Sequence, residues 1–383
     1  MNPESRAWNE KLIGVEGGIA RLDTPALVLD LDAFEYNLRA MVAIARAHGV
    51  ALRPHAKTHK SVAVAKAQLE AGAIVGFCCA KLGEAEALAR GGIDRILLTS
   101  PVFFASKLER LVALHARLRE LSVVVDDPVQ VEALAAAFSA AGRRLRVLVD
   151  VDVGSHRFGV PTVADALALA RRIAAEPALE LAGIQGYAGT VQHIPDYRER
   201  AAAAAPAAAR LAEIRDALRT EHLPCPIVTG AGTGTHEIDA KSAVFTDLQV
   251  GSYAFMDVEY LDCALTDDGT ARFRAALEVW TRVVSRHHPG FVTTDAGIKC
   301  FATDGPPPRV AAGAPEGARY RMFGDQFGRL ELSPGAPNPP LGAIVRCIVP
   351  HCDPTINLWD HLLCRRGETL EAIWAIEGRG AVA

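Results

Sequence analysis

Short apolar runs alternate with amphipathic, alanine-rich stretches between about Val50 and Val250, and this alternation restricts the fold more than any other feature of the chain. It is typical of βα units that surround a parallel sheet. Eight of the apolar runs are candidate strands, at residues 51–54, 74–78, 95–99, 122–125, 146–151, 183–187, 227–230 and 248–251. Eight such strands predict an α/β fold of the closed (β/α)8, or TIM-barrel, type.

The pattern changes after about Glu278, where short β-rich segments are separated by Pro and Gly turns. This change predicts a second, mostly β domain, with strands near residues 280–284, 290–294, 343–348 and 372–376. The apolar run at 26–30 precedes the barrel, and we expect it to pair with the second domain. We therefore expect a barrel at residues 30–270 and a β-rich domain formed by residues 1–29 plus 271–383.

The stretch after this first apolar run has the pattern of a helix. Asp32 and Glu35 are spaced as in a capping box, which predicts the helix start. Apolar residues then recur at helical spacing and predict a buried face, at Phe34, Leu38, Met41, Val42 and Ala45. Further along, Pro206 lies within an alanine-rich helical stretch, and we expect it to kink or restart that helix.

Composition and charge exclude several functional classes. Half of the 383 residues are hydrophobic, and the formal net charge is −4. The chain has no long run of Lys and Arg, which argues against nucleic acid as a partner. Residues 1–22 lack the unbroken apolar stretch of a signal peptide or membrane span. The eight cysteines form no Cys-x-x-Cys pair, which argues against a disulfide framework or zinc knuckle. We expect a cytoplasmic protein, not bound to a membrane, that acts on small molecules.

A basic segment at residues 53–60 follows the first predicted barrel strand and contains Lys57. Active sites of such barrels lie where the strands end. Neighbouring cations favour a neutral amine, the form that makes a Schiff base with an aldehyde. The alternative is an ordinary solvated basic turn.

Two glycine-containing segments follow the seventh and eighth predicted strands, at residues 229–235 and 251–253. Their backbone amides and hydroxyl groups are suited to bind phosphate, and phosphate sites of these barrels commonly follow strands seven and eight. Each segment alone is compatible with a simple turn. Their joint position favours a phosphate site.

Other polar residues also follow predicted strands. Arg157 lies a few residues after the fifth strand, and Tyr187 and His193 lie at and after the end of the sixth. A surface ion pair for Arg157 and a loop histidine for His193 are the alternatives to a role in the barrel mouth. In the second domain, His351 and Asp353 would project to the same side of an extended backbone. Such a pair suits Mn²⁺, Zn²⁺ or Mg²⁺, and the alternative is a hydrogen-bonded turn.

Together these segments resemble the family of D-threonine aldolase and 3-hydroxy-D-aspartate aldolase, within the pyridoxal phosphate (PLP) fold shared with alanine racemase and D-serine dehydratase. The likeness runs almost end to end. It rests on residues 23–25, 53–60, 78–79, 183–187, 192–193, 229–235, 248–257, 295–297 and 351–355.

The resemblance implies a role for each candidate residue. Lys57 would carry PLP covalently, and Arg157 and Tyr187 would contact the pyridine ring. The phosphate would be held by Gly232, Thr233, Gly234, Thr235, Gly251, Ser252 and Tyr253. The divalent metal would bind to His351 and Asp353, with Asp325 near that site as a substrate contact and His193 as an acid/base or substrate contact.

The reaction implied by the resemblance is the retro-aldol cleavage of a D-β-hydroxy-amino acid, such as D-threonine or D-phenylserine, to glycine and an aldehyde. The enzyme would be a carbon–carbon lyase and a homodimer. The main alternative is a dehydratase that gives a keto acid and ammonia; an amino-acid racemase and a non-catalytic PLP carrier are further alternatives. Dehydratases of this fold typically carry cysteine as the second metal ligand, so Asp353 favours the aldolase.

Two positions depart from the family pattern. Ala80 stands where glutamine is usual, and Phe327 stands where histidine is usual, two residues after Asp325. Because an apolar ring replaces an imidazole, one hypothesis is that the substrate has a bulkier or more apolar side chain.

Overall fold

The computed structural model describes residues 3–383, which divide into a barrel unit and a β-rich unit. The barrel unit comprises Ala40–Gly251, Cys263–Thr270 and Gly380–Ala383, and the β-rich unit comprises residues 3–39, Ser252–Asp262 and Ala271–Arg379. The predicted barrel range of 30–270 is therefore broader than the barrel unit. One reason is Asn37, whose side-chain amide donates to the carbonyl oxygens of Ala254 and Arg274 and so joins three segments of the β-rich unit.

The barrel unit contains eight parallel strands, in the order β2-β9-β8-β7-β6-β5-β4-β3. Parallel bridges between Leu52 and Ile74 and between His55 and Cys78 join β2 to β3, so that the sheet closes on itself and confirms the predicted barrel. The strands are β2 (Ala51–Leu52), β3 (Phe77–Cys79), β4 (Arg95–Leu98), β5 (Glu120–Val125), β6 (Leu145–Asp150), β7 (Leu179–Gly186), β8 (Ile227–Gly230) and β9 (Asp247–Leu248). β2 and β9 are shorter than predicted.

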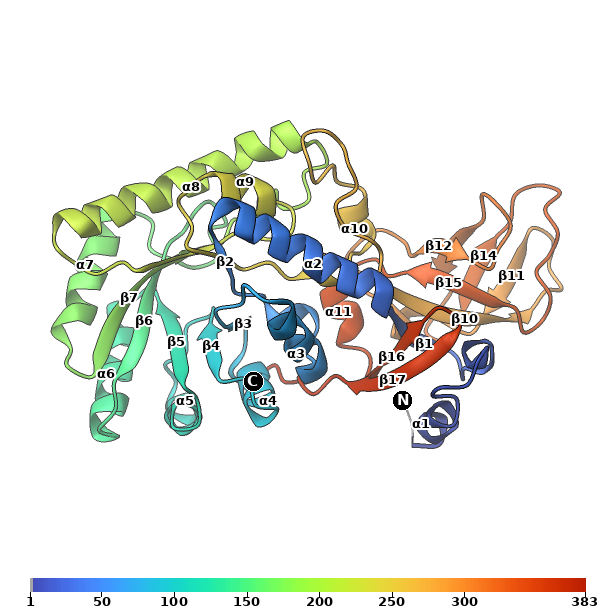
Figure 1. Cartoon of the computed structure of the whole chain (residues 1–383), viewed down its shortest axis with the longest axis horizontal. Coiled ribbons are helices and arrows are strands. Elements are labelled where there is room, and N and C mark those ends of the chain that lie inside the picture. The colour runs from blue at the N-terminus through green and yellow to red at the C-terminus, as the bar shows by residue number, and fades with distance from the viewer. Residues whose placement is uncertain (1–2) are drawn as a thin grey trace. The chain divides into compact units, whose positions relative to one another are not determined.

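Helices surround these strands on the outside (Figure 1). They are α3 (Val62–Ala71), α4 (Leu82–Arg90), α5 (Ala105–His115), α6 (Pro128–Ala140), α7 (Val163–Ala175), α8 (Tyr197–Thr220) and α9 (His236–Lys241). The predicted restart of the helix at Pro206 is wrong, because α8 runs through it as one helix, whereas the predicted kink stays a prediction. Pro206 lies on the exposed side of α8, where water can bind the carbonyl group that the missing N–H leaves unpaired.

The β-rich unit is built on a mixed sheet with the order β13-β14-β11-β10-β1-β16-β17, and β15 also pairs with β10 and β12. β1 (Ala26–Asp30) pairs with β10 (Leu277–Ser285) and β16 (His361–Arg366), which confirms that the first apolar run belongs to the second domain. The other strands are β11 (Phe291–Thr294), β12 (Arg309–Ala312), β13 (Arg319–Met322), β14 (Gly328–Glu331), β15 (Ile344–Ile348) and β17 (Thr369–Ala375).

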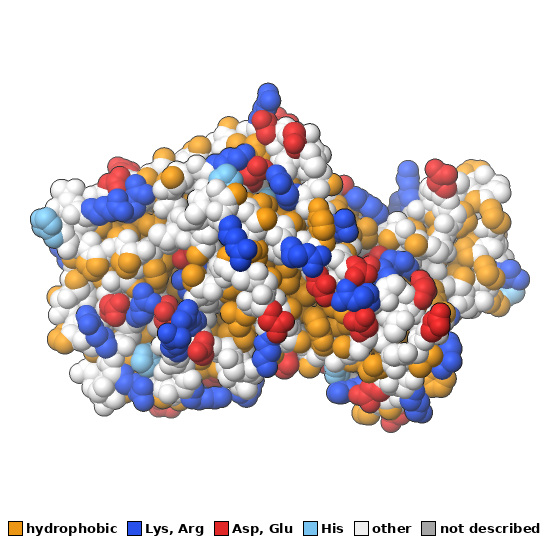
Figure 2. All heavy atoms as spheres, viewed as in Figure 1, with side chains coloured by type: hydrophobic (Ala, Val, Ile, Leu, Met, Phe, Trp, Pro, Cys, Tyr) orange, Lys and Arg blue, Asp and Glu red, His pale blue; other side chains and the backbone are white. Residues whose placement is uncertain are grey.

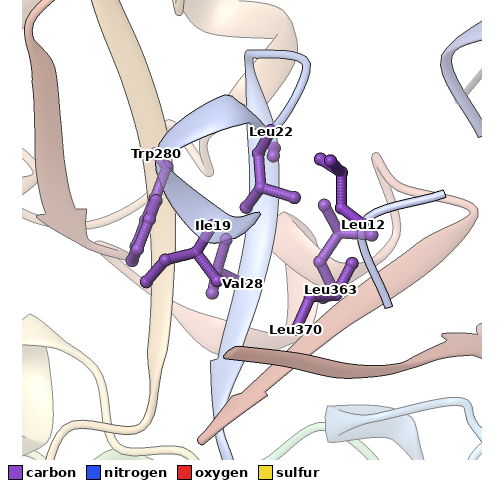
Figure 3. Close-up of a cluster of buried hydrophobic side chains, with 8 residues drawn as sticks. Leu12, Ile19, Leu22, Val28, Trp280, Leu363 and Leu370 are labelled. Atoms are coloured by element: carbon purple, nitrogen blue, oxygen red, sulfur yellow. The ribbon is translucent and has the colours of Figure 1, made fainter. Parts of the chain in front are cut away.

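A cluster of buried apolar side chains packs against this sheet (Figure 3). It joins the segment that follows α1 (Pro3–Glu10) to strands from the C-terminal part of the chain, through Leu12, Ile19, Leu22, Val28, Trp280, Leu363 and Leu370. Burial of one such side chain contributes roughly 1.5–3 kcal/mol. The cluster therefore holds the two sequence-distant parts of the β-rich unit together.

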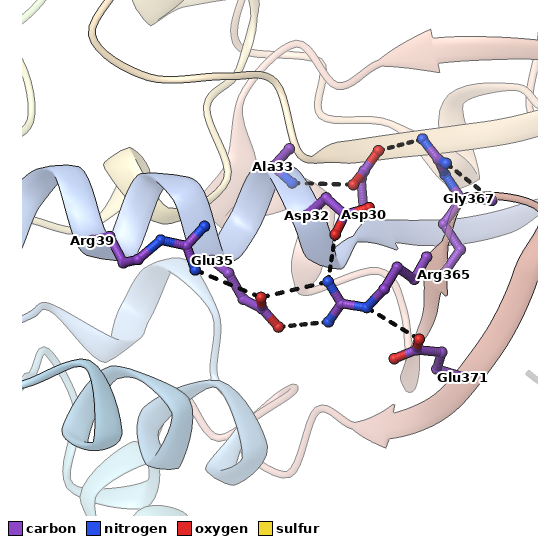
Figure 4. A network of polar contacts seen from close by, with 9 residues as sticks. Asp30, Asp32, Ala33, Glu35, Arg39, Arg365, Gly367 and Glu371 are labelled. Carbon is purple, nitrogen blue, oxygen red and sulfur yellow. Dashed lines mark hydrogen bonds and ion pairs between the residues drawn. The ribbon is translucent and has the colours of Figure 1, made fainter.

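Helix α2 (Leu31–His48) follows β1 and buries its predicted apolar face, including Phe34 and Met41. The predicted capping box is wrong. The side chain of Asp30 accepts the hydrogen bond from Ala33 N at 3.1 Å, whereas Asp32 and Glu35 pair with Arg366 (Figure 4). The two carboxylates that the sequence pattern assigned to the helix cap therefore bind the guanidinium group of Arg366 instead.

On the face shown in Figure 2, Lys and Arg side chains are interspersed with Asp and Glu side chains. Nucleic-acid surfaces instead concentrate cations. Among residues 3–383, no helix is long and apolar enough to span a membrane.

Candidate active site

A cavity of about 290 Å³ lies at the C-terminal ends of the barrel strands. Three of the predicted cofactor residues, Lys57, Arg157 and Tyr187, line it together. The remaining lining residues are His55, Ala80, Lys81, Thr99, Ser100, Phe158, Gln185 and Gln249. Lys57 and Tyr187 are 130 positions apart in the sequence, yet they line the same cavity. This is expected at the mouth of a barrel, because all the strands end there.

Lys57 belongs to a short 3-10 turn, Ala56–Thr58, that follows β2. Its backbone N–H donates to His55 Nδ1 at 3.4 Å, and His55 Nε2 lies 3.1 Å from Thr99 Oγ1. Because the single proton of Thr99 Oγ1 is donated to Cys79 O at 3.3 Å, His55 Nε2 must be the donor toward Thr99. This chain of hydrogen bonds fixes the imidazole and the turn that carries Lys57.

The cavity lining is cationic. Lys57, Lys81 and Arg157 line it and no carboxylate does, whereas Lys60 is turned to a buried ion pair with Glu84 at 2.7 Å. A cationic lining favours an anionic ligand. The lining and the volume fit a small molecule with phosphate or carboxylate groups, as PLP and an amino acid have.

The glycine loop after β8 is arranged around Gln192. The side-chain oxygen of Gln192 accepts hydrogen bonds from Gly234 N at 3.0 Å and Thr235 N at 3.3 Å, and its Nε2 donates to Thr235 Oγ1 at 3.1 Å. A Cβ atom at Gly232 or Gly234 would overlap Gln192. The loop therefore needs glycine for close approach of Gln192, and none of its residues lines the Lys57 cavity.

The other predicted phosphate residues lie where the chain passes from the barrel unit, which includes Gly251, to the β-rich unit, which includes Ser252 and Tyr253. A Cβ atom at Gly251 would overlap Thr58 Oγ1, so that Gly251 lies against the turn that carries Lys57. Ser252 and Tyr253 are buried and belong to the β-rich unit. The assignment of these residues to the phosphate remains a prediction.

The two predicted substrate contacts are exposed. His193 lies in the barrel unit, shortly after the 3-10 turn Gly189–Val191, and does not line the Lys57 cavity. Asp325 lies in the turn between β13 and β14, where its backbone carbonyl accepts from Lys299 N at 3.1 Å. Phe327, in the same turn, is 49% exposed.

His351 and Asp353 lie at the start of the short helix α11 (Cys352–Ile356). The prediction of an extended backbone through both residues is wrong: His351 is extended and precedes the helix, and Asp353 is in its first turn. His351 Nδ1 lies 3.0 Å from Asp304 Oδ2 and 3.9 Å from Glu259 Oε2. The sequence pattern missed both of these carboxylates, which come from distant segments.

These carboxylates crowd around the imidazole. Burial lowers the pKa of His351, but the charges of Asp353 and nearby carboxylates outweigh burial and leave it raised. Burial also raises the pKa of Glu259, and the negative charges of Asp304 and Asp353 raise it further. A divalent cation would relieve this repulsion, so the donor set fits one.

The metal would nevertheless need ligands besides protein side chains. Within residues 3–383, no group of three or more His, Cys, Asp or Glu side chains is positioned to hold a metal ion. A metal held by His351 and Asp353 alone would keep its other positions for water or substrate, as Mg²⁺ sites often do.

The chain combines a closed βα barrel, a lysine in a cationic cavity at the barrel mouth, and a β-rich second unit. This combination is typical of the PLP-binding barrel proteins. Two family matches agree with this class: "Alanine racemase, N-terminal domain" at residues 29–259 and "Putative serine dehydratase domain" at residues 276–365. The chain belongs to the alanine racemase N-terminal domain family, in the branch that contains D-threonine aldolase and 3-hydroxy-D-aspartate aldolase.

Several relatives match nearly the whole chain. D-threonine aldolase of Arthrobacter sp is 43% identical over 94% of this chain and 94% of its own length. 3-Hydroxy-D-aspartate aldolase of Paracoccus denitrificans (strain Pd 1222) is 37% identical over 94% and 93%. The crystal structure of D-threonine aldolase from Filomicrobium marinum superimposes with a TM-score of 0.89 at 39% identity and covers 95% of this chain and 97% of its own. D-threo-3-hydroxyaspartate dehydratase of Delftia sp. (strain HT23) is more distant: it is 32% identical over 74% of this chain and 73% of its own length.

Proposed function

We propose that the chain is a PLP- and divalent-metal-dependent aldolase that cleaves D-β-hydroxy-amino acids to glycine and an aldehyde. One observation carries this proposal: Lys57, Arg157 and Tyr187 line a single cavity in a chain that is 43% identical to a D-threonine aldolase over 94% of its length. The named aldolases are more similar to the chain than the named dehydratase.

In this proposal Lys57 binds the aldehyde of PLP, and Arg157 and Tyr187 orient its ring. PLP supplies an electron-withdrawing ring that stabilises the negative charge left when a bond to the substrate α-carbon breaks. Lys81 and Arg157 supply positive charge for the anionic groups of the bound molecules. His193, which is exposed, is our candidate for the group that takes the β-hydroxyl proton and exchanges it with water.

The divalent metal in this proposal binds to His351 and Asp353, and it would be Mn²⁺, Mg²⁺ or Zn²⁺. A cation beside the β-hydroxyl group would lower the pKa of that hydroxyl and orient it. Asp304 lies 3.0 Å from His351 Nδ1 and would hold the imidazole in place, as hydrogen-bonding carboxylates do in other metal sites, and Glu259 adds a second negative charge 3.9 Å away.

Product analysis tests the proposed reaction. The purified protein is incubated with PLP and Mn²⁺ and, in parallel, with D-threonine, D-phenylserine and 3-hydroxy-D-aspartate, with and without EDTA. We expect glycine and aldehyde that appear only with metal, and none from Lys57→Ala. A clear preference for D-threonine over D-phenylserine would contradict an apolar substrate pocket, and no glycine from any of the three would contradict the aldolase.

A dehydratase is the second candidate, because residues 276–365 match the putative serine dehydratase domain. The same incubations separate the two reactions, since a dehydratase yields a keto acid and ammonia instead of glycine.

We also propose that the protein is a cytoplasmic homodimer. All eight cysteines are free thiols, which suits a reducing compartment. Light scattering after size exclusion measures the mass, and a value near 40.8 kDa, the mass of one chain, would contradict the dimer.

A further inference from the structure

The barrel interior contains a chain of buried polar groups that the proposed cofactor and metal sites do not use. Its members lie in or directly after five strands and are each at most 5% exposed: Arg53, Asp150, Gln185, Thr229, Asp247 and Gln249. Two of them, Gln185 and Gln249, also line the Lys57 cavity. The chain therefore connects the barrel interior to the candidate active site.

The ion pair between Arg53 and Asp247, at one end of the chain of polar groups, fixes which atom donates in each of the following hydrogen bonds. Arg53 Nε lies 3.0 Å from Asp247 Oδ1 and Arg53 Nη2 lies 3.3 Å from Oδ2, so that Asp247 is an ionised acceptor. Thr229 Oγ1 donates its only proton to Asp247 Oδ1 at 2.5 Å. The hydroxyl oxygen of Thr229 can therefore only accept from any further neighbour.

This constraint determines how the Gln249 amide is turned. The atom of Gln249 that lies 3.1 Å from Thr229 Oγ1 must be the donor Nε2, and the same Nε2 donates to Gln185 Oε1 at 3.0 Å. Gln185 Nε2 then donates to Asp150 Oδ1 at 3.1 Å. Both protons of Gln249 Nε2 are thus used, whereas Gln249 Oε1 has no hydrogen-bond partner among residues 3–383.

The cavity therefore combines cations with an oriented neutral acceptor. Lys81 and Arg157 suit the anionic groups of a ligand, and an amide oxygen held by its own nitrogen suits an N–H donor. We propose that Gln249 Oε1 accepts a hydrogen bond from an N–H group of the bound molecule, and that Thr229 is the positioning residue that fixes this oxygen. The inference rests on the proposed function, in which the N–H belongs either to the protonated ring of the cofactor or to the amine of the amino acid.

Two variants remove the proposed contact, and a third is a matched control. Gln249→Met removes the acceptor with little change in size, and Thr229→Val removes the group that fixes its direction. Thr246→Val is the control, because Thr246 Oγ1 also lies 3.2 Å from Asp247 Oδ2, shares its one proton between that oxygen and Val228 O at 3.1 Å, and makes no bond to Gln249. Thermal unfolding shows whether each variant is folded; if Thr229→Val is not, Gln249→Met decides.

Two binding titrations read out the contact. PLP is titrated into the cofactor-free protein, and D-phenylserine is titrated into the PLP-loaded protein while cofactor absorbance is followed. We expect Gln249→Met and Thr229→Val to raise one of the two Kd values about tenfold, the loss of one hydrogen bond, and Thr246→Val to change neither by more than about twofold.

The two titrations identify the donor. A higher Kd for PLP alone assigns the N–H to the cofactor ring, and a higher Kd for D-phenylserine alone assigns it to the amine. Unchanged Kd values in Gln249→Met, or equal effects in Thr246→Val, would overturn the inference. Neither titration needs product formation, so a failure of the proposed cleavage leaves this test intact.

Discussion

Asp150 is a buried carboxyl group whose ionisation opposes folding. Burial raises its pKa from 3.8 to about 7, although the hydrogen bond from Gln185 lowers it. Between these two pH values the native protein keeps a proton that the unfolded chain releases, so that stability falls as pH rises. We therefore expect Asp150→Asn to match the wild type below about pH 4 and to gain up to about 4 kcal/mol of unfolding free energy above pH 7.

Urea unfolding at pH 4.5 and pH 8 measures this difference. Asp94→Asn is the matched control, because Asp94 is exposed and its charge stays in water in both states. An equal effect of Asp150→Asn at the two pH values would mean that the buried carboxyl group does not titrate in this range.

Single residues of the site were predictable where they lie within a few residues of the end of a strand. Lys57, Arg157 and Tyr187 share a cavity because barrel strands end at one face, which the alternation of strands and helices already implies. Gln185 and Gln249 were missed because a glutamine in or after an apolar strand has no local signal that says which way it points. Asp304 and Glu259 were missed because their closeness to His351 depends on the fold of distant segments.

At the scale of elements, the glycine loop after β8 depends on one side chain. Gln192 is 1% exposed and accepts from two loop amides. Gln192→Leu would leave both amides without this acceptor, and a buried unpaired group costs about 1–3 kcal/mol. We expect a loss of about 2–6 kcal/mol for the two amides in urea unfolding, whereas the same substitution at the exposed Gln326 leaves stability unchanged. A neutral Gln192→Leu would show that the loop is held by other contacts.

Most strands formed by buried apolar runs were predicted, although β16 was missed together with the short strands β12, β13 and β14. All eight barrel strands exist, since each is a buried apolar run. β12 and β13 were missed because half of their residues are exposed and charged or small. The helix at His351 was also missed, although Asp353 in its first turn is favoured there by the helix dipole.

At the scale of the whole molecule, the residues proposed to bind PLP and those proposed to bind the metal belong to different units. Lys57 lies in the barrel unit, and His351 and Asp353 lie in the β-rich unit. The domain limits predicted from sequence placed residues 30–39 and 252–262 in the barrel, because amphipathic segments give no sign of the unit on which they pack.

This division makes a prediction for thermal unfolding. A ligand that binds only the folded state stabilises it by about 2.7 kcal/mol at a concentration of 100 Kd. Mn²⁺ should therefore raise the Tm of the wild type, and Asp353→Asn should abolish this rise while it keeps the rise that PLP causes. Lys57→Ala should show the converse. If the units unfold separately, each ligand should shift only the transition of its own unit. An equal response of Asp353→Asn and the wild type to Mn²⁺ would mean that the cation binds elsewhere, because the variant lacks one of its two proposed protein ligands.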